Sequence, residues 1–195
     1  PVVSWTINPS LPSGLDIDVS TGEISGTPSS LSTLTTYTIT ATNTGGFTTT
    51  TIDIIVNDII PSSVSYVPDT YTFTKGTSES TSTPSANGGP VVSWEIHPTL
   101  PNGLSIDSST GQISGTSTAI SPTQTYTVYA NNSGGSATTT IDITVNDIVP
   151  SLVTYSSSDF VETRDSAMTT GVPTASGGPV ITWSITPALP AGLDI

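Results

Sequence analysis

A repeat of 89 residues is the feature that most constrains how this chain folds. Residues 1–5 read Pro-Val-Val-Ser-Trp, residues 90–94 read the same, and residues 179–183 read Pro-Val-Ile-Thr-Trp. The copies start at residues 1, 90 and 179, so the spacing is 89 residues both times (90 − 1 and 179 − 90). A period of this length is the size of a small domain, and it predicts a tandem array of one domain type.

Each repeat closes with Asn-Asp-Ile, then Ile or Val, then Pro, at residues 57–61 and 146–150. A proline cannot continue a strand ladder, so we expect a new unit to begin there. This predicts three parts. Residues 1–58 are the later part of one repeat, residues 59–147 are a complete repeat, and residues 148–195 are the earlier part of a third. The chain is then expected to be an excerpt of a longer array.

Apolar and polar residues alternate with a period of two in the complete repeat. Val92, Trp94 and Ile96 are expected to face the core, and the same alternation recurs in segments 126–130 and 141–145. Such a pattern indicates strands that are buried on one face. Glycine-rich turns separate the segments, and no window has helical spacing with caps. About seven strands per repeat predict an all-β fold of tandem immunoglobulin-like β-sandwich domains, one complete and two partial, with the Trp in the core.

Composition excludes several functions. The chain has 15 acidic and 2 basic side chains, for a formal charge of −13. Phosphate backbones and anionic lipid surfaces would be repelled by such a chain, so we expect no nucleic-acid partner. There is no cysteine, hence no disulfide, no thiolate chemistry and no cysteine-ligated zinc. No apolar run is long enough to cross a membrane, and no membrane insertion is expected in this segment.

A longer motif gives a family resemblance. Residues 11–27 and 100–116 share the pattern Leu-Pro-x-Gly-Leu-x-Ile-Asp-x-Ser-Thr-Gly-x-Ile-Ser-Gly-Thr, and an Asn-x-Gly-Gly hairpin follows in each copy. This resembles the Ig-like, cadherin-like repeats of bacterial and archaeal surface proteins. The resemblance implies an extracellular or cell-surface location in a stalk, adhesin or fibre of many copies, and no more specific function than that.

The segment that ends each repeat is also similar to the linker of calcium-binding cadherin repeats. That similarity implies Asn57, Asp58, Asn146 and Asp147 as candidate calcium ligands; no other cofactor is expected. Calcium prefers six to eight oxygen ligands, several of them anionic. The acidic segment that cadherins carry after an earlier strand reads Gly-Thr-Pro or Gly-Thr-Ser here. Capping of the following turn is therefore the alternative role for the two aspartates.

The two basic residues occupy one position of the repeat, because Lys75 and Arg164 are 89 residues apart (164 − 75). One cation per repeat in so acidic a chain suggests a salt bridge, within the domain or at an interface with another chain; simple solvation is the alternative. Asn131 begins an Asn-Asn-Ser sequon beside the hairpin and is a candidate for N-glycosylation.

No residue pattern predicts catalysis. His97 is the only histidine, and its counterparts in the other copies are Asn8 and Thr186. We therefore expect a non-catalytic structural segment of an extracellular fibre, filament or surface stalk. Its partners would be further repeats of the same chain or identical neighbouring subunits, since a partial sandwich exposes strand edges. The alternative is an adhesin or carbohydrate-binding accessory module, for which Tyr129, replacing Thr40 of the previous copy, is the candidate contact.

Overall fold

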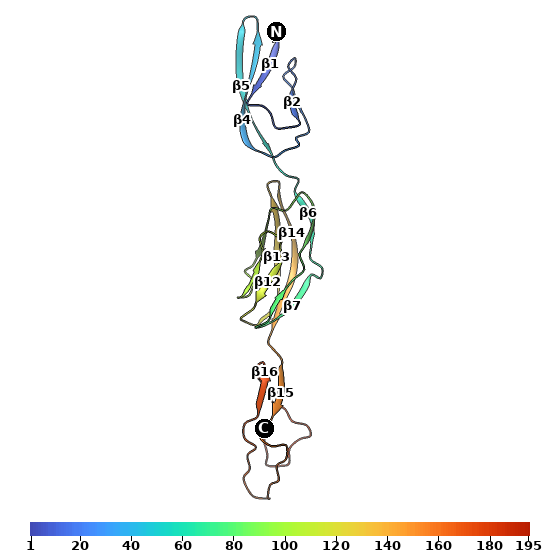
Figure 1. Cartoon of the computed structure of the whole chain (residues 1–195), viewed down its shortest axis with the longest axis vertical. Coiled ribbons are helices and arrows are strands. Elements are labelled where there is room, and N and C mark those ends of the chain that lie inside the picture. The colour runs from blue at the N-terminus through green and yellow to red at the C-terminus, as the bar shows by residue number, and fades with distance from the viewer.

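A computed structural model describes residues 1–195 and contains strands but no helix. Figure 1 shows three bodies placed end to end and joined by short single segments of chain, with the N-terminus at one end of the row. The predicted all-β class, tandem immunoglobulin-like β-sandwich domains, is confirmed.

The first body contains two short sheets. In one, β4 lies between β1 and β5, and in the other β2 pairs with β3. All of these pairs are antiparallel. The bounds are β1 (Ser4–Asn8), β2 (Leu15–Ile17), β3 (Ile24–Gly26), β4 (Ser32–Asn43) and β5 (Gly46–Val56).

The middle body is a complete repeat of nine strands. One sheet has the order β10-β13-β14-β7, a second has the order β11-β12-β8, and β6 pairs with β9 in a separate ribbon. The bounds are β6 (Pro61–Ser65), β7 (Thr70–Thr74), β8 (Ser78–Ser80), β9 (Ser85–Gly88), β10 (Ser93–His97), β11 (Leu104–Ile106), β12 (Ile113–Thr116), β13 (Ser121–Asn132) and β14 (Gly135–Asn146).

One strand pair of the middle body differs from the others. β7 runs parallel to β14, from the pair Thr70 and Asp142 to the pair Thr74 and Asn146, whereas every other pair is antiparallel. Because an early strand and the last strand of the repeat point the same way, the chain enters this body at one end and leaves it at the other (Figure 1).

The nine strands exceed the seven expected because two long strands are each interrupted near a proline. Pro68 lies between β6 and β7, and Pro84 lies between β8 and β9. Proline has no N–H to give to a ladder, so pairing stops, and each half of the strand joins a different sheet.

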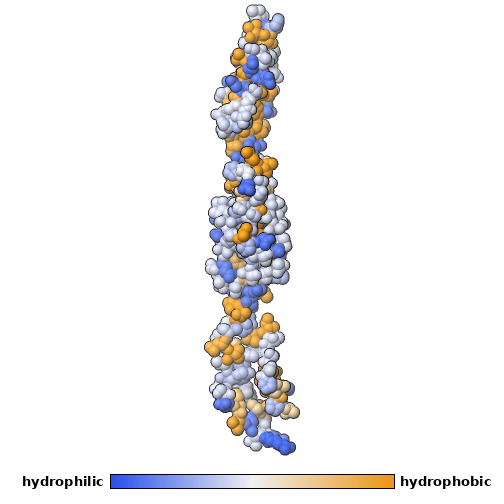
Figure 2. Space-filling model, turned by 90° about the vertical axis from the view of Figure 1, so that its right-hand side faces the viewer, coloured by the Kyte–Doolittle hydropathy of each residue, from blue (hydrophilic) through white to orange (hydrophobic).

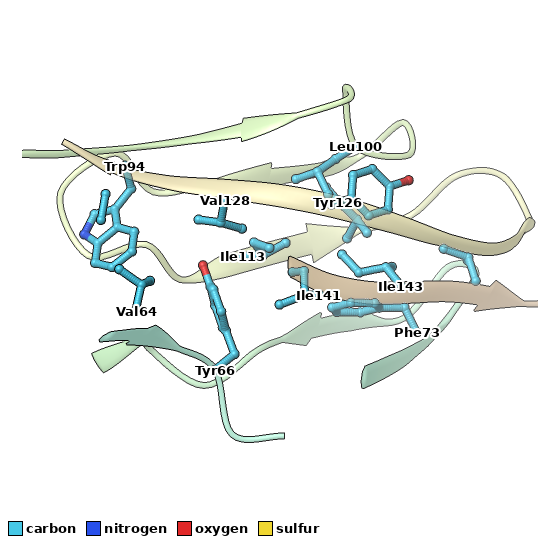
Figure 3. Packing of buried hydrophobic residues seen from close by; sticks show 13 residues of the cluster. Val64, Tyr66, Phe73, Trp94, Leu100, Ile113, Tyr126, Val128, Ile141 and Ile143 are labelled. Carbon is cyan, nitrogen blue, oxygen red and sulfur yellow. The ribbon is translucent and has the colours of Figure 1, made fainter. Parts of the chain in front are cut away.

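The core of the middle body follows the predicted alternation. Tyr126 and Val128 of β13 and Ile141 and Ile143 of β14 are almost completely buried between the two sheets. Figure 3 shows them packed with Trp94 and Val64 at one end of the core and Phe73 at the other. Without a disulfide, burial of these side chains holds the sheets together, at about 1.5–3 kcal/mol for each fully buried large apolar side chain.

The prediction for the start of the Trp strand was wrong at one position. Trp94 is buried and Ile96 is partly buried, but Val92 is 67% exposed, and Val91 packs against the core instead. β10 begins only at Ser93, so the two valines lie in the loop after Pro90, where side chains do not alternate as they do in a strand.

The third body contains only the antiparallel pair of β15 (Pro150–Thr154) and β16 (Thr174–Gly177). Its Trp183 is 42% exposed, whereas the equivalent Trp94 is 6% exposed. The side chains that would form a core line an open groove of about 1070 Å³. Figure 2 shows this contrast, because orange hydrophobic residues lie on the surface of both outer bodies and are sparse on the middle one.

The buried side chains of β14 are expected to dominate stability. Ile143→Ala leaves a cavity at a side chain that is 0% exposed, and the free energy of unfolding should fall by about 2–5 kcal/mol. Val92→Ala is the control, because it truncates a side chain that is 67% exposed, and it should change stability by less than about 0.5 kcal/mol. Urea unfolding followed through the amide signals of β13 and β14 measures both. Equal losses would contradict this core assignment.

Candidate functional site

A set of side-chain hydrogen bonds lies at the junction between the first and middle bodies. Between β5 and β6, the junction segment 57–60 lies against the hairpin that joins β13 to β14. The Asp58 N–H donates to Ser133 Oγ at 3.0 Å, and the Ser133 hydroxyl donates to Asp58 Oδ2 at 3.1 Å. Asn132 Nδ2 donates to the carbonyl oxygens of Ile59, at 2.7 Å, and Pro90, at 3.1 Å. These bonds attach the linker to a hairpin more than 70 residues later in the sequence.

Two residues of the hairpin, Asn132 and Gly134, make this contact possible. Asn132 Oδ1 accepts the N–H groups of Gly134, at 2.9 Å, and Gly135, at 3.2 Å, so one end of the amide closes the turn while the other holds the linker. A Cβ on Gly134 would overlap the carbonyl oxygen of Asp58. Glycine is therefore required here because another part of the backbone approaches closely.

The second junction lies between β14 and β15. Asp147 Oδ1 accepts the N–H of Ile148 at 3.0 Å, and the Lys75 N–H donates to the Asn146 carbonyl at 2.9 Å, which extends the ladder of β7 and β14. The Ile148 side chain reaches the turn after β7, since its Cδ1 lies 3.8 Å from where a Cβ on Gly76 would be.

The four candidate calcium ligands are divided between the junctions, Asn57 and Asp58 at one and Asn146 and Asp147 at the other. No group of three or more His, Cys, Asp or Glu side chains comes close enough to hold a metal ion. Calcium prefers several anionic oxygens, and the Asp58 carboxylate already accepts a hydrogen bond from Ser133. The residues at one junction thus provide only part of such a site, and calcium binding stays a prediction.

The two basic side chains have different surroundings. Lys75 is half-buried in the turn after β7 and has no carboxylate in salt-bridge range, whereas Arg164 Nε lies 3.5 Å from its neighbour Asp165. Both side chains of that pair are more than four-fifths exposed, and exposed pairs contribute little to stability. The structure therefore gives the repeated cation no common partner within the chain.

The remaining candidates lie on β13. Asn131 is half-buried and pairs with Ser93 and Ser136, and the hydroxyl of its sequon, on Ser133, is bonded to the junction. Tyr129 is also half-buried and lies across from Glu95 and Thr138. Glycosylation at Asn131 and ligand contact at Tyr129 stay predictions.

A contact that the sequence did not predict lies under Trp94 of the middle body. The Asp107 carboxylate accepts the N–H groups of Ser109, at 2.8 Å, and Thr110, at 2.9 Å, and these bonds, that from Thr110 first, lower its pKa below the usual value. This turn places Gly111 against the ring of Trp94, and the buried Tyr66 hydroxyl donates to the Gly111 carbonyl at 2.6 Å.

The same arrangement in the first body shows that this contact belongs to the repeat. Asp18 accepts bonds from Ser20 and Thr21, and Gly22 lies against Trp5. In the middle body, burial first and the neighbouring Tyr71 second raise the pKa of Tyr66, so its hydroxyl keeps its proton and its hydrogen bond. A signal was present in the sequence, because each Gly recurs 17 residues after its Trp (22 − 5 and 111 − 94).

The fold and its junctions define a class of protein, a tandem array of immunoglobulin-like sandwich domains. The family described as Putative Ig domain matches residues 2–57 and 53–146, which is more than half of the chain. The chain belongs to that family. Its domains are common in extracellular and surface proteins and are generally non-catalytic. The structure has no helix that could span a membrane.

Solved structures give further likenesses. A chimeric titin Z1Z2-Z1Z2 tandem is 19% identical, with a TM-score of 0.33, and the match covers 58% of this chain and 65% of that one. Protocadherin Gamma B7 extracellular cadherin domains 1–4 are 18% identical, with a TM-score of 0.35, over 85% of this chain and 47% of that one. An endo-fucoidan hydrolase of glycoside hydrolase family 107 is 22% identical, with a TM-score of 0.33, over 75% of this chain and 24% of that one.

The chain spans less than two thirds of the length of each of these structures. Likenesses of this size carry no information on function. A search of curated proteins gave no match.

The glycine under Trp94 should be intolerant of a side chain. In Gly111→Ala the new Cβ would lie 2.6 Å from Pro84 Cγ and 2.7 Å from Trp94 Cδ2, at a φ of 74°. Gly76→Ala is the matched control, with a φ of 79° and its nearest atom at 3.8 Å. Gly111→Ala should be less stable than the control by about 1–3 kcal/mol, the usual cost of overpacking. Urea unfolding measures this difference, and equal stability of the two variants would show that Trp94 does not need the glycine.

The Asp107 turn should make stability depend on pH in acid. Its carboxyl pKa is lowered from the usual 3.8 by the two backbone N–H groups, so the ionised form stabilises the fold above pH 3.8. That stabilisation is lost as the pH falls through the lowered pKa. Asp107→Asn should therefore be less stable than the natural chain at neutral pH, and the difference should shrink below pH 3.8. Thermal unfolding across this range measures it. A difference that does not change with pH would assign the effect to shape rather than charge.

Proposed function

We propose that this chain is a non-catalytic structural segment of an extracellular fibre, filament or surface stalk. The observation that carries the proposal is the parallel pairing of β7 with β14 in the complete repeat. Because of it, the chain enters and leaves at opposite ends, and each added repeat extends the array instead of folding back on it (Figure 1).

The same pairing suits a segment under tension. Pulling the two ends of the repeat draws β7 toward its start and β14 toward its end. The hydrogen bonds between Thr70–Thr74 and Asp142–Asn146 are then loaded together, in shear. A ladder that must break at once resists more force than a hairpin that opens one bond at a time. This geometry supports a role in which repeats transmit force between a surface and a distal part.

The proposed partners are further repeats of the same chain or identical neighbouring subunits. In the first body β5 has no strand on the side where the equivalent β14 carries β7. In the third body residues 159–163, the counterpart of β7, form no strand. A strand from a neighbouring repeat or subunit would satisfy these edges, because an unpaired edge is a template for another strand.

Removal of one period from the natural protein tests this function. Deletion of residues 59–147 joins Asp58 to Ile148 and restores the sequence Asn-Asp-Ile-Val-Pro at the new junction. We expect the protein to stay at the cell surface and the fibre or stalk to become shorter by one repeat, as measured by electron microscopy with a label at its distal end.

An adhesin or carbohydrate-binding module would give a different result. The deletion would then abolish attachment to a target, and so would Tyr129→Thr, which copies Thr40 of the previous repeat. A structural segment predicts no effect of Tyr129→Thr on attachment or on length. Loss of attachment in the point variant would overturn the proposed function.

A further inference from the structure

We propose that the hairpin Asn132-Ser133-Gly134-Gly135 is a docking site whose ligand is the junction segment 57–60, Asn-Asp-Ile-Ile, which joins the preceding repeat to this one. Docking would fix the orientation of one repeat on the next, so that the array is a stiff rod. The inference rests on the proposed function, because stiffness matters for a segment that holds two points apart.

The assignment of donors at this site is unambiguous. Gly134 and Gly135 present N–H groups to Asn132, which require its oxygen, and Ile59 and Pro90 present carbonyl oxygens, which require its nitrogen. Both ends of the amide are therefore used in one orientation. Only a side chain that accepts at one end and donates at the other can close the turn and hold the linker.

The two equivalent hairpins differ in what lies beside their glycines, because the junction segment fills this space only in the middle body. In the middle body the Asp58 carbonyl lies over Gly134, and the Ile60 side chain lies 3.5 Å from where a Cβ on Gly135 would be. In the first body the turn is closed in the same way, since Asn43 Oδ1 accepts the N–H of Gly45 at 2.8 Å. There, however, nothing lies within 4 Å of a Cβ on Gly46.

An open groove of about 350 Å³ remains beside the first hairpin, lined among others by Val2, Ala41, Asn43 and Phe47. The hairpin beside this groove is closed by an asparagine in the same way as the occupied hairpin, and apolar side chains form the sides of the groove. It therefore fits a second copy of the same kind of segment.

The second junction shows the other half of the contact. Ile148 is the counterpart of Ile59, 89 residues on (148 − 59). Its side chain lies near the Gly76 turn of the repeat that precedes it. Between two complete repeats, one isoleucine would therefore contact the preceding repeat through its side chain, while its carbonyl oxygen is held by the hairpin of the following repeat. With both neighbours attached to the same residue, little freedom of rotation remains.

The orientation of the first two bodies tests the docking site. The chain has no cysteine, so Thr49→Cys and Thr140→Cys introduce two unique, exposed positions for spin labels, one on each body. Pulsed dipolar electron paramagnetic resonance of the full chain then gives the distribution of distances between them. We expect one narrow peak.

Asn132→Asp should broaden that peak and lower its height. The variant keeps the oxygen that closes the turn and replaces the donor with an oxygen that faces two carbonyl groups. Ser133→Ala, at an exposed position, should also broaden the peak with little risk to folding. Asn102→Asp, an exposed asparagine of the same body outside the junction, adds the same charge and should leave the peak unchanged.

A broad distribution in the labelled chain without a junction substitution would overturn the docking site, and so would narrow peaks in both junction variants. Equal broadening by Asn102→Asp would also overturn it. These outcomes do not touch the proposed function, because a flexible array still adds length. Conversely, an unchanged fibre length after deletion of a repeat would reject the structural role and leave the docking measurement intact.

Discussion

The parallel ladder between β7 and β14 is the interaction on which the rest of the structure depends. It joins an early strand of the repeat to its last strand, so the sheet β10-β13-β14-β7 is complete only when both parts of the repeat are present. It also sets the direction of the array, because parallel strands at the two ends of a repeat place its termini at opposite poles. The middle body, which contains this ladder, buries its Trp94, whereas the equivalent Trp183 of the third body is exposed; Figure 2 shows hydrophobic residues on the surface of the outer bodies.

Two smaller contacts occur in phase in the first and middle bodies. Under the Trp, an aspartate closes a turn whose glycine lies against the indole ring, as Asp107 does for Gly111 and Asp18 for Gly22. At the pole of the repeat, an asparagine closes the last hairpin and, in the middle body, also holds the junction segment. In both contacts a short polar side chain accepts hydrogen bonds from backbone N–H groups and so closes a turn. The turn contains a glycine, and the backbone or a ring lies against this glycine, where a side chain would not fit.

Local pattern predicted the parts of the fold that depend on alternation. The buried faces of β13 and β14 and the core position of Trp94 follow from a period of two, and the array follows from the spacing of 89 residues. The exposure of Val92 was not predicted, because the strand begins one residue after it. The interruption of two long strands near Pro68 and Pro84 was also not predicted, although both prolines are present in the sequence.

The candidate sites were harder to predict than the fold. The bond from Asn132 to Ile59 joins residues 73 positions apart, and no local pattern reveals such a pair. Lys75 and Arg164 share a position in the repeat, but their surroundings differ because only Lys75 lies in a complete body. Sequence periodicity identifies equivalent residues, whereas their contacts depend on which neighbouring strands are present.

Force spectroscopy on the single chain, held at its two ends, is the most direct test of the central claim that the β7–β14 ladder closes the repeat and bears tension along the array. The account predicts one abrupt rupture of the middle body, with a gain in length that corresponds to its residues. Gradual extension of the whole chain without a rupture peak would contradict it, because the ladder would then open bond by bond and would not hold the two ends of the repeat together.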